Sequence, residues 1–71
     1  MVEITVPESL EGKTLAEADL RNSVGVFVLG LRDVMQGRFQ MFPEGRTKLI
    51  QEQILLVIGR EEELARLREM N

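Results

Sequence analysis

The chain of 71 residues contains no cysteine, histidine, tryptophan or tyrosine. Without cysteine or histidine it has no thiolate nucleophile, no imidazole base, no disulfide and no ordinary zinc site. Carboxylates, amines, hydroxyls and backbone groups are what remain for chemistry. A domain of this length buries only about 60% of the surface of its unfolded chain, so association with a partner is the form of stabilisation this composition leaves open.

Basic side chains and long hydrophobic runs are also scarce. Twelve acidic and nine basic residues give a net charge of −3, which disfavours attraction to nucleic acid or anionic lipid. The longest apolar runs, Val24 to Leu31 and Ile54 to Ile58, fall far below the roughly 20 residues that cross a membrane. The N-terminus lacks the pattern of a signal peptide. We therefore expect a soluble, cytosolic, single domain over residues 1–71, without nucleic-acid binding or direct membrane insertion.

The N-terminal part of the chain carries one strand pattern and one helix signal. Polar and apolar residues alternate from Val2 to Val6, which predicts a half-buried strand that Pro7 ends. Thr14 and Glu17 have the spacing of a capping box, in which each side chain satisfies a free amide at a helix start. The pattern predicts a short helix from there to about Asn22.

The rest of the chain predicts three strands and a final helix. A strand over Val24 to Leu31 is followed by a loop over Asp33 to Gly37 and a second strand over Arg38 to Phe42, which suits an antiparallel hairpin. A third strand spans Gln53 to Ile58. The pattern predicts a helix over Arg60 to Arg68, with acidic residues at its start and basic residues at its end. The order strand-helix-strand-strand-strand-helix predicts an α+β fold, a small mainly antiparallel sheet with helices packed on it.

Two of the expected strands, Val24 to Leu31 and Gln53 to Ile58, are apolar on both faces. In a domain this small, one helix layer covers one face of a sheet and leaves the other open. A second copy of the chain is the simplest cover for the open face. We therefore expect a symmetric homodimer whose interface includes Val24, Val26, Val28, Phe39, Leu55 and Val57.

Several segments, in order and spacing, match a known family. They are Val6 to Leu15, Asp19 to Arg21 before Gly25-Val26, Val28 to Arg32, Leu49, Ile54 to Gly59 and the helix with Leu64 and Leu67. With these segments the chain resembles, over nearly its full length, the C-terminal regulatory domain of the RCK family, also called the TrkA-C domain.

The resemblance implies a non-catalytic domain that senses ligands, pairs with itself and regulates prokaryotic potassium channels, uptake systems and antiporters at the cytosolic face of the membrane. Such domains usually follow a Rossmann-like nucleotide-binding domain, whose Gly-x-Gly-x-x-Gly motif is not in this sequence. Family ligands include cyclic di-AMP and divalent cations, bound at or near the dimer interface. The implied ligand cleft involves Arg21, Asn22, Val26, Phe27 and Val28.

Two departures from the family pattern bear on the ligand. Phe27 stands where cyclic-dinucleotide binders tend to have a polar residue, often Asn. Glu52-Gln53 replaces a common Gly-Asp turn before the last strand, so that turn has to avoid a positive φ. Both departures favour an alternative hypothesis, a purely structural dimerisation module without a ligand. A cyclic di-AMP sensor is the other alternative.

Each candidate residue also has a simpler structural interpretation. Arg21 either grips a phosphate through two parallel hydrogen bonds or is a solvated residue at a helix end. Asn22 serves equally as a helix stop, and Glu61 to Glu63 as charges that suit a helix N-terminus rather than a cation site. The phenylalanines and Met41 are typical packing residues. A Ser-Lys pair such as Ser9 with Lys13 is formally possible, but no spacing in the sequence supports a positioned base or an oxyanion site, so we expect no enzymatic role.

Overall fold

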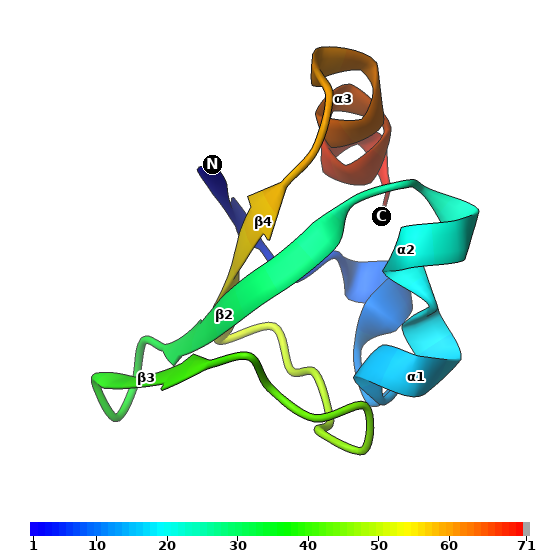
Figure 1. Ribbon diagram of the computed structural model, residues 1–71. Coiled ribbons are helices and arrows are strands. Elements are labelled where there is room, and N and C mark those ends of the chain that lie inside the picture. The colour runs from blue at the N-terminus through cyan, green and yellow to red at the C-terminus, as the bar shows by residue number, and fades with distance from the viewer. Residues whose placement is uncertain (71) are drawn as a thin grey trace.

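The computed structural model describes residues 1–70 and contains strands and helices in the expected order (Figure 1). Within these residues the strands form a single antiparallel sheet of order β1-β4-β2-β3. Its strands are β1 (Val2–Thr5), β2 (Phe27–Asp33), β3 (Arg38–Met41) and β4 (Gln53–Ile58). The helical segments are the 3-10 turn η1 (Glu8–Leu10), α1 (Leu15–Ala18), α2 (Leu20–Ser23) and α3 (Glu61–Glu69). The expected α+β class is confirmed.

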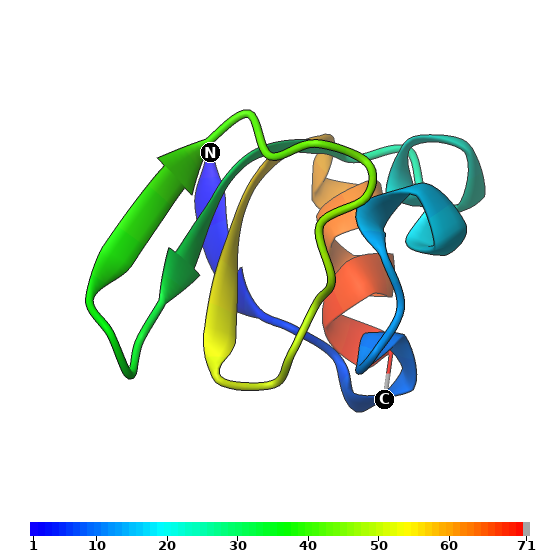
Figure 2. The same ribbon diagram turned by 90° about the horizontal axis from the view of Figure 1, so that it is seen from below.

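All helical segments lie on one side of the sheet (Figure 2). The side chains between the two layers form the hydrophobic core, centred on Leu55 and Val57 of the central strand β4. Leu64 and Leu67 supply the buried stripe of α3, as their spacing predicts. Within residues 1–70 no helix covers the opposite face of the sheet, and Phe27 and Ile58 on that face are exposed.

The helix expected from Thr14 to Asn22 is wrong in one respect, because it breaks into two short turns at Asp19. Asp19 has a left-handed backbone, with φ 45° and ψ 50°. In one straight helix, Ala18 and Leu20 would face different directions, since only residues three or four apart share a face. The break lets both side chains enter the core. Asp tolerates this conformation better than most residues, which is why the chain breaks there.

The strand expected from Val24 to Leu31 starts later, at Phe27, and continues to Asp33. The amides of Val24 and Gly25 both donate to the carbonyl of Leu20, so this segment ends a helix instead of extending a sheet. Gly25 has φ +94°, a conformation that side-chain-bearing residues rarely adopt. Val24 and Gly25 therefore belong to the end of the preceding helix, although their apolar pattern alone predicts a strand.

β4 has the expected bounds, and the other elements differ from expectation by single residues. The strand expected to end at Phe42 stops at Met41: the Phe42 amide still donates to the carbonyl of Leu29, but its left-handed backbone, with φ 49°, turns the chain away from β2. The first strand ends at Thr5, and the last helix starts after Arg60, which is its N-cap. The hairpin pairing of β2 and β3 is antiparallel as expected, and β2 has a bulge between Val28 and Gly30.

The expected capping box is present at the start of α1 and has a consequence for acid stability. The amide of Thr14 donates to Oε1 of Glu17 at 2.8 Å, and the amide of Glu17 donates to Oγ1 of Thr14 at 3.1 Å. The backbone hydrogen bond from Thr14 is the main cause that lowers the pKa of Glu17 below its ordinary value of 4.5. A lowered pKa means that the charged carboxylate stabilises the folded state above the unfolded-state pKa, and that this contribution is lost as pH falls through the folded-state pKa.

We therefore expect Glu17→Gln to weaken the acid dependence of stability below pH 4.5, the ordinary value of this carboxyl. Glutamine keeps an oxygen that accepts the Thr14 amide but does not titrate. Urea unfolding of wild type and variant over a series of acidic buffers measures the difference. An identical decline of stability with pH in both proteins would contradict the assignment.

Candidate functional site

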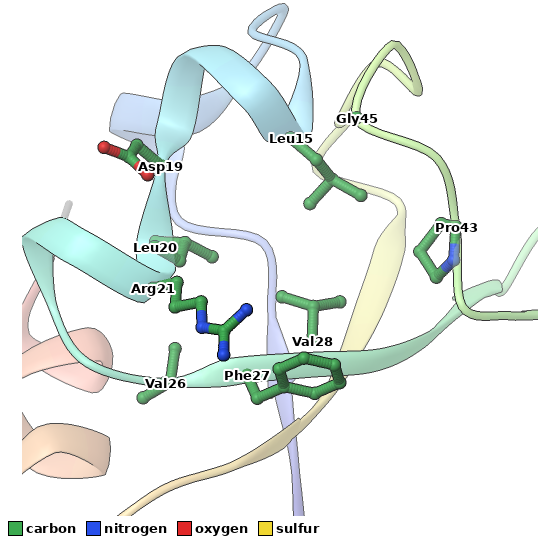
Figure 3. A pocket seen from close by; sticks show the side chains of 9 residues that line it. All are labelled: Leu15, Asp19, Leu20, Arg21, Val26, Phe27, Val28, Pro43 and Gly45. Carbon is green, nitrogen blue, oxygen red and sulfur yellow. The ribbon is translucent and has the colours of Figure 1, made fainter.

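A hollow of about 360 Å³ opens between the α1–α2 segment, the start of β2 and the loop that follows β3 (Figure 3). Three segments that are distant in the sequence meet there. Its wall is largely apolar, with one guanidinium and one carboxylate at its rim. The lining residues are Leu15, Asp19, Leu20, Arg21, Val26, Phe27, Val28, Pro43 and Gly45.

Unusual backbone conformations place the side chains around this hollow. The left-handed Asp19 turns the chain so that α2 carries Arg21 to the rim. The turn at Gly25 ends the helical segment, so that β2 begins at Phe27. Phe42, at φ 49°, redirects the chain out of β3 so that Pro43 forms the opposite wall. Backbone strain of this kind is concentrated at functional sites in proteins.

Arg21 and Phe27 form the most specific contact of the hollow. The guanidinium carbon of Arg21 lies 5.6 Å from the centroid of the Phe27 ring, within cation–π range. The Asp19 carboxylate points away from the guanidinium in Figure 3 and accepts hydrogen bonds from Asn22 at 3.0 and 3.3 Å. Among residues 1–70 the ion pairs are Arg32–Glu3 and Arg46–Glu44, so Arg21 keeps its donors free.

This arrangement suits a ligand that combines an anionic group with an apolar or planar part. A guanidinium with free donors binds a carboxylate or phosphate through two parallel hydrogen bonds. The ring of Phe27 and the side chains of Leu15, Val28 and Pro43 offer apolar contact beside it. The hollow therefore has the chemistry of a small-molecule binding site, with few polar groups in a mostly apolar wall.

The structure brings together four of the five residues expected at the ligand cleft. Arg21, Val26, Phe27 and Val28 all line the hollow. Asn22 does not line it, because its amide donates to Asp19 on the far side of the helix break. Ligand binding by this set stays a prediction.

Other lining residues were not expected from the sequence. They are Leu15, Asp19, Leu20, Pro43 and Gly45. The break in pattern from Pro43 to Gly45 was the available signal, but only the fold places it opposite Phe27.

Most of the residues expected at the dimer interface lie in the chain's own core instead of on the open face of the sheet. Four of them, Val24, Val26, Leu55 and Val57, are buried in the core of the chain itself. Val28 packs against that core. Of the six, Phe39 alone lies on the open face of the sheet, 50% exposed. Because alternate residues of a strand face opposite sides, the side chains available to a partner are the neighbours of these residues.

The described part of the chain offers little for metal binding. Residues 1–70 contain no group of three or more acidic side chains placed to hold a metal ion. In the run from Glu61 to Glu63, Glu63 turns back and accepts a hydrogen bond from the Arg60 amide, completing a helix cap. Likewise, no helix within residues 1–70 is long and apolar enough to span a membrane.

Solved structures of RCK C domains share this fold. The chain is similar to the RCK C domain of the potassium transport protein KtrA in complex with cyclic di-AMP (24% identity, TM-score 0.87, covering 96% of this chain and 78% of that chain). It is also similar to the RCK_C dimer of S. agalactiae BusR in complex with cyclic di-AMP (23%, 0.84, 94% and 88%). A third similar structure is the GsuK channel bound to NAD (23%, 0.84, 97% and 13%).

BusR also corrects one expectation about partners. A longer BusR chain, of which this domain covers 33%, was solved in complex with promoter DNA (TM-score 0.82, 23% identity, 94% of this chain). The expectation that nucleic acid is not a partner therefore does not hold for every protein that contains a domain of this fold. No curated protein sequence matches the chain.

A family profile gives the most direct assignment. The profile of the TrkA-C domain matches residues 1–71, the whole length of the chain. The sheet order, the helices on one face and the similar RCK C structures agree with this match. The chain therefore belongs to the TrkA-C domain family, a family of regulatory domains.

Proposed function

We propose that residues 1–71 form a single non-catalytic domain that pairs with itself, senses a small ligand and thereby regulates potassium transport. The observation that carries this proposal is the hollow in which Arg21 lies over Phe27 with free donors. A rigid guanidinium beside apolar walls is a recognition site. It lacks the base and the nucleophile that a catalytic site requires.

Cyclic di-AMP is the first ligand to test. The KtrA and BusR domains of the same fold were solved with this molecule. Its phosphodiesters suit the free guanidinium of Arg21, and its adenines suit the ring of Phe27 and the apolar wall. Phe27 stands where binders of cyclic di-AMP often have Asn. In this chain, stacking of the Phe27 ring on an adenine therefore takes the place of a hydrogen bond from the Asn amide. Divalent cations are the second class of ligand.

The proposed partner is a potassium channel or transporter subunit with a Rossmann-like domain, at the cytosolic face of the membrane. The GsuK channel, of which this domain covers 13%, supports that placement. The DNA complex of BusR supports a second candidate, control of transcription by an attached DNA-binding part. In either case a ligand changes transport or transcription only by as much as it binds one arrangement of the two protomers more tightly than the other.

The test combines binding and assembly. We expect calorimetry to detect binding of cyclic di-AMP to the wild type and Arg21→Ala to weaken it at least tenfold, because a charge-assisted bidentate contact is lost. Arg66→Ala, an exposed arginine on α3, serves as the matched control and is expected to bind as the wild type does.

The alternative is a structural dimerisation module without a ligand. A protein that is dimeric by light scattering but shows no heat or thermal shift with cyclic di-AMP, adenine nucleotides, Mg²⁺ or Mn²⁺ would support that alternative. A monomer at about 50 µM would overturn the pairing itself, since a stable dimer of standard interface size persists at that concentration.

A further inference from the structure

A second hollow, here called the hairpin hollow, has a volume of about 170 Å³ and lies at the end of β2 where the chain turns into β3. It shares no lining residue with the hollow beside Arg21, which lies at the opposite end of β2 (Figure 1). Most of its side chains are charged or carry an amide, so its chemistry differs from that of the largely apolar first hollow. Its lining residues are Leu31, Asp33, Gln36, Arg38, Gln40 and Gln53.

The strand register places most of these side chains on the face of the sheet that carries the core. Leu31 of β2 lies opposite Gln40 of β3. Asp33, the next residue on this face of β2, lies opposite Arg38 of β3 and Gln53 of β4. Leu31 is 4% exposed and belongs to the core, whereas Arg38 and Gln40 are exposed. The hydrophobic core therefore ends at Leu31, and the same face continues as an open, polar hollow.

Asp33 and Arg38 carry opposite charges at facing positions but do not form an ion pair. Opposite charges at such positions of a sheet normally attract each other and stabilise it. Here Oδ1 of Asp33 instead accepts hydrogen bonds from the amides of Met35 and Gln36, at 3.0 and 3.1 Å. The ion pairs within residues 1–70 involve other side chains. Oδ2 of Asp33 and the guanidinium of Arg38 are therefore available to a ligand.

The glutamines of the hairpin hollow add uncharged donors and acceptors. Oε1 of Gln53 accepts a hydrogen bond from the Ile50 amide at 2.9 Å, which leaves the two N–H donors of the Gln53 side chain for a ligand. Gln36 and Gln40 each supply an amide beside the two charges. A ligand in this hollow therefore meets a cation, an anion and neutral polar groups together.

These groups suit a small zwitterion. One guanidinium and one carboxylate give the hollow no net charge, so a simple anion or cation is attracted by one group and repelled by the other. The Cα atoms of facing residues lie about 4.5–5.5 Å apart, so one small molecule can reach both side chains. If each non-hydrogen atom takes roughly the 30 Å³ of a water molecule, the hollow holds about six of them, the size of a small α-amino acid.

We propose that the hairpin hollow binds a small α-amino acid. The guanidinium of Arg38 donates charge-assisted hydrogen bonds to the carboxylate of the ligand, and Oδ2 of Asp33 accepts one from its ammonium group. The glutamine amides fix its orientation. Because this site uses none of the residues of the hollow beside Arg21, it gives the domain a second ligand site and does not depend on the proposed function.

The test is a titration of the isotope-labelled chain followed by NMR, since amide shifts identify the residues that a weak ligand contacts. L-alanine is the probe, and we expect saturable shifts centred on Asp33, Arg38 and Gln40. Propionate lacks the ammonium group and ethylamine lacks the carboxylate. At the same pH and ionic strength, each is expected to bind at least tenfold more weakly than L-alanine, because one charge-assisted contact is lost.

Two variants test the assigned roles. Asp33→Asn and Arg38→Gln are each expected to weaken binding of L-alanine at least tenfold. Asparagine keeps an oxygen that accepts the two turn amides, so the hairpin is retained while the charge is lost. Arg66→Gln is the matched control, because Arg66 is an exposed arginine on α3 outside the hollow, and it is expected to bind as the wild type does.

Three results would overturn the proposal. The first is the absence of a saturable shift at about 50 mM L-alanine, a concentration well above a millimolar dissociation constant. The second is equal binding of propionate, which would show an anion site at Arg38 only. The third is a set of shifts centred outside the hairpin hollow. None of these results bears on binding of cyclic di-AMP beside Arg21, which calorimetry measures separately.

Discussion

Leu55→Ala is expected to cost about 2–5 kcal/mol of folding free energy, the range for a leucine removed from a core. Leu55 lies in the central strand β4, is 0% exposed and pairs with both Ile4 and Leu31. Domains of this length have a total stability of only about 4–10 kcal/mol. One truncation therefore removes a large share of it.

Urea unfolding measures this effect at a fixed protein concentration. With a slope of about 1 kcal/mol per molar urea, the midpoint is expected to fall by roughly 2–5 M. Val34→Ala is the control, because Val34 is 57% exposed at the hairpin tip, and it is expected to change the free energy of unfolding by about 0.5 kcal/mol or less. Equal effects of the two substitutions would contradict the assigned core.

Gly25→Ala is expected to destabilise the chain by about 2–4 kcal/mol for two separable reasons. The backbone at Gly25 has φ +94°, which strains any residue with a side chain. A Cβ there would also lie 2.5 Å from Oε2 of Glu63, whose other oxygen caps α3. Relieving this contact means displacing the Glu63 carboxylate and weakening the cap.

Two further variants separate the two causes. Gly12 has a similar φ of +83°, but a Cβ at that position would meet nothing within 4 Å, so Gly12→Ala is expected to cost only about 1–2 kcal/mol. In a Glu63→Ala background, Gly25→Ala is expected to cost less than in the wild type. Thermal or urea unfolding of these variants and the wild type measures both differences. Equal costs at the two glycines would show that the contact with Glu63 plays no part.

The sequence predicted the elements whose signals are local. The Thr14–Glu17 capping box, the alternation in β1 and the leucine stripe of α3 depend on residues close in the chain, so each was found at its place. The two largest errors, at the first helix and at the start of β2, share one cause. Between Ala18 and Phe27 an apolar pattern does not distinguish a broken helix with a glycine turn from a helix followed by a longer strand, because tertiary packing of Ala18 and Leu20 decides where the chain bends.

The candidate site also combines residues that the sequence indicated with residues that only the fold brings together. Arg21, Phe27 and Val28 were found because they stand in segments that resemble a known family. Pro43 and Gly45 were missed because they reach the hollow only through the hairpin that returns the chain past β2. Asn22, also expected at the cleft, does not line the hollow, because the backbone turns at Asp19 and the Asp19 carboxylate accepts a hydrogen bond from the Asn22 amide.

The sequence by itself determined the fold class, the limits on chemistry that follow from lacking cysteine and histidine, and the excess of apolar strand surface. Only the tertiary structure decided which apolar side chains meet the helices and which meet solvent. The physical reason is the two-residue period of a strand: a register shift of one residue exchanges its two faces. Pairing of β4 with β1 and β2 set that register, which buried Leu55 and Val57 and left Ile58 and Phe27 exposed.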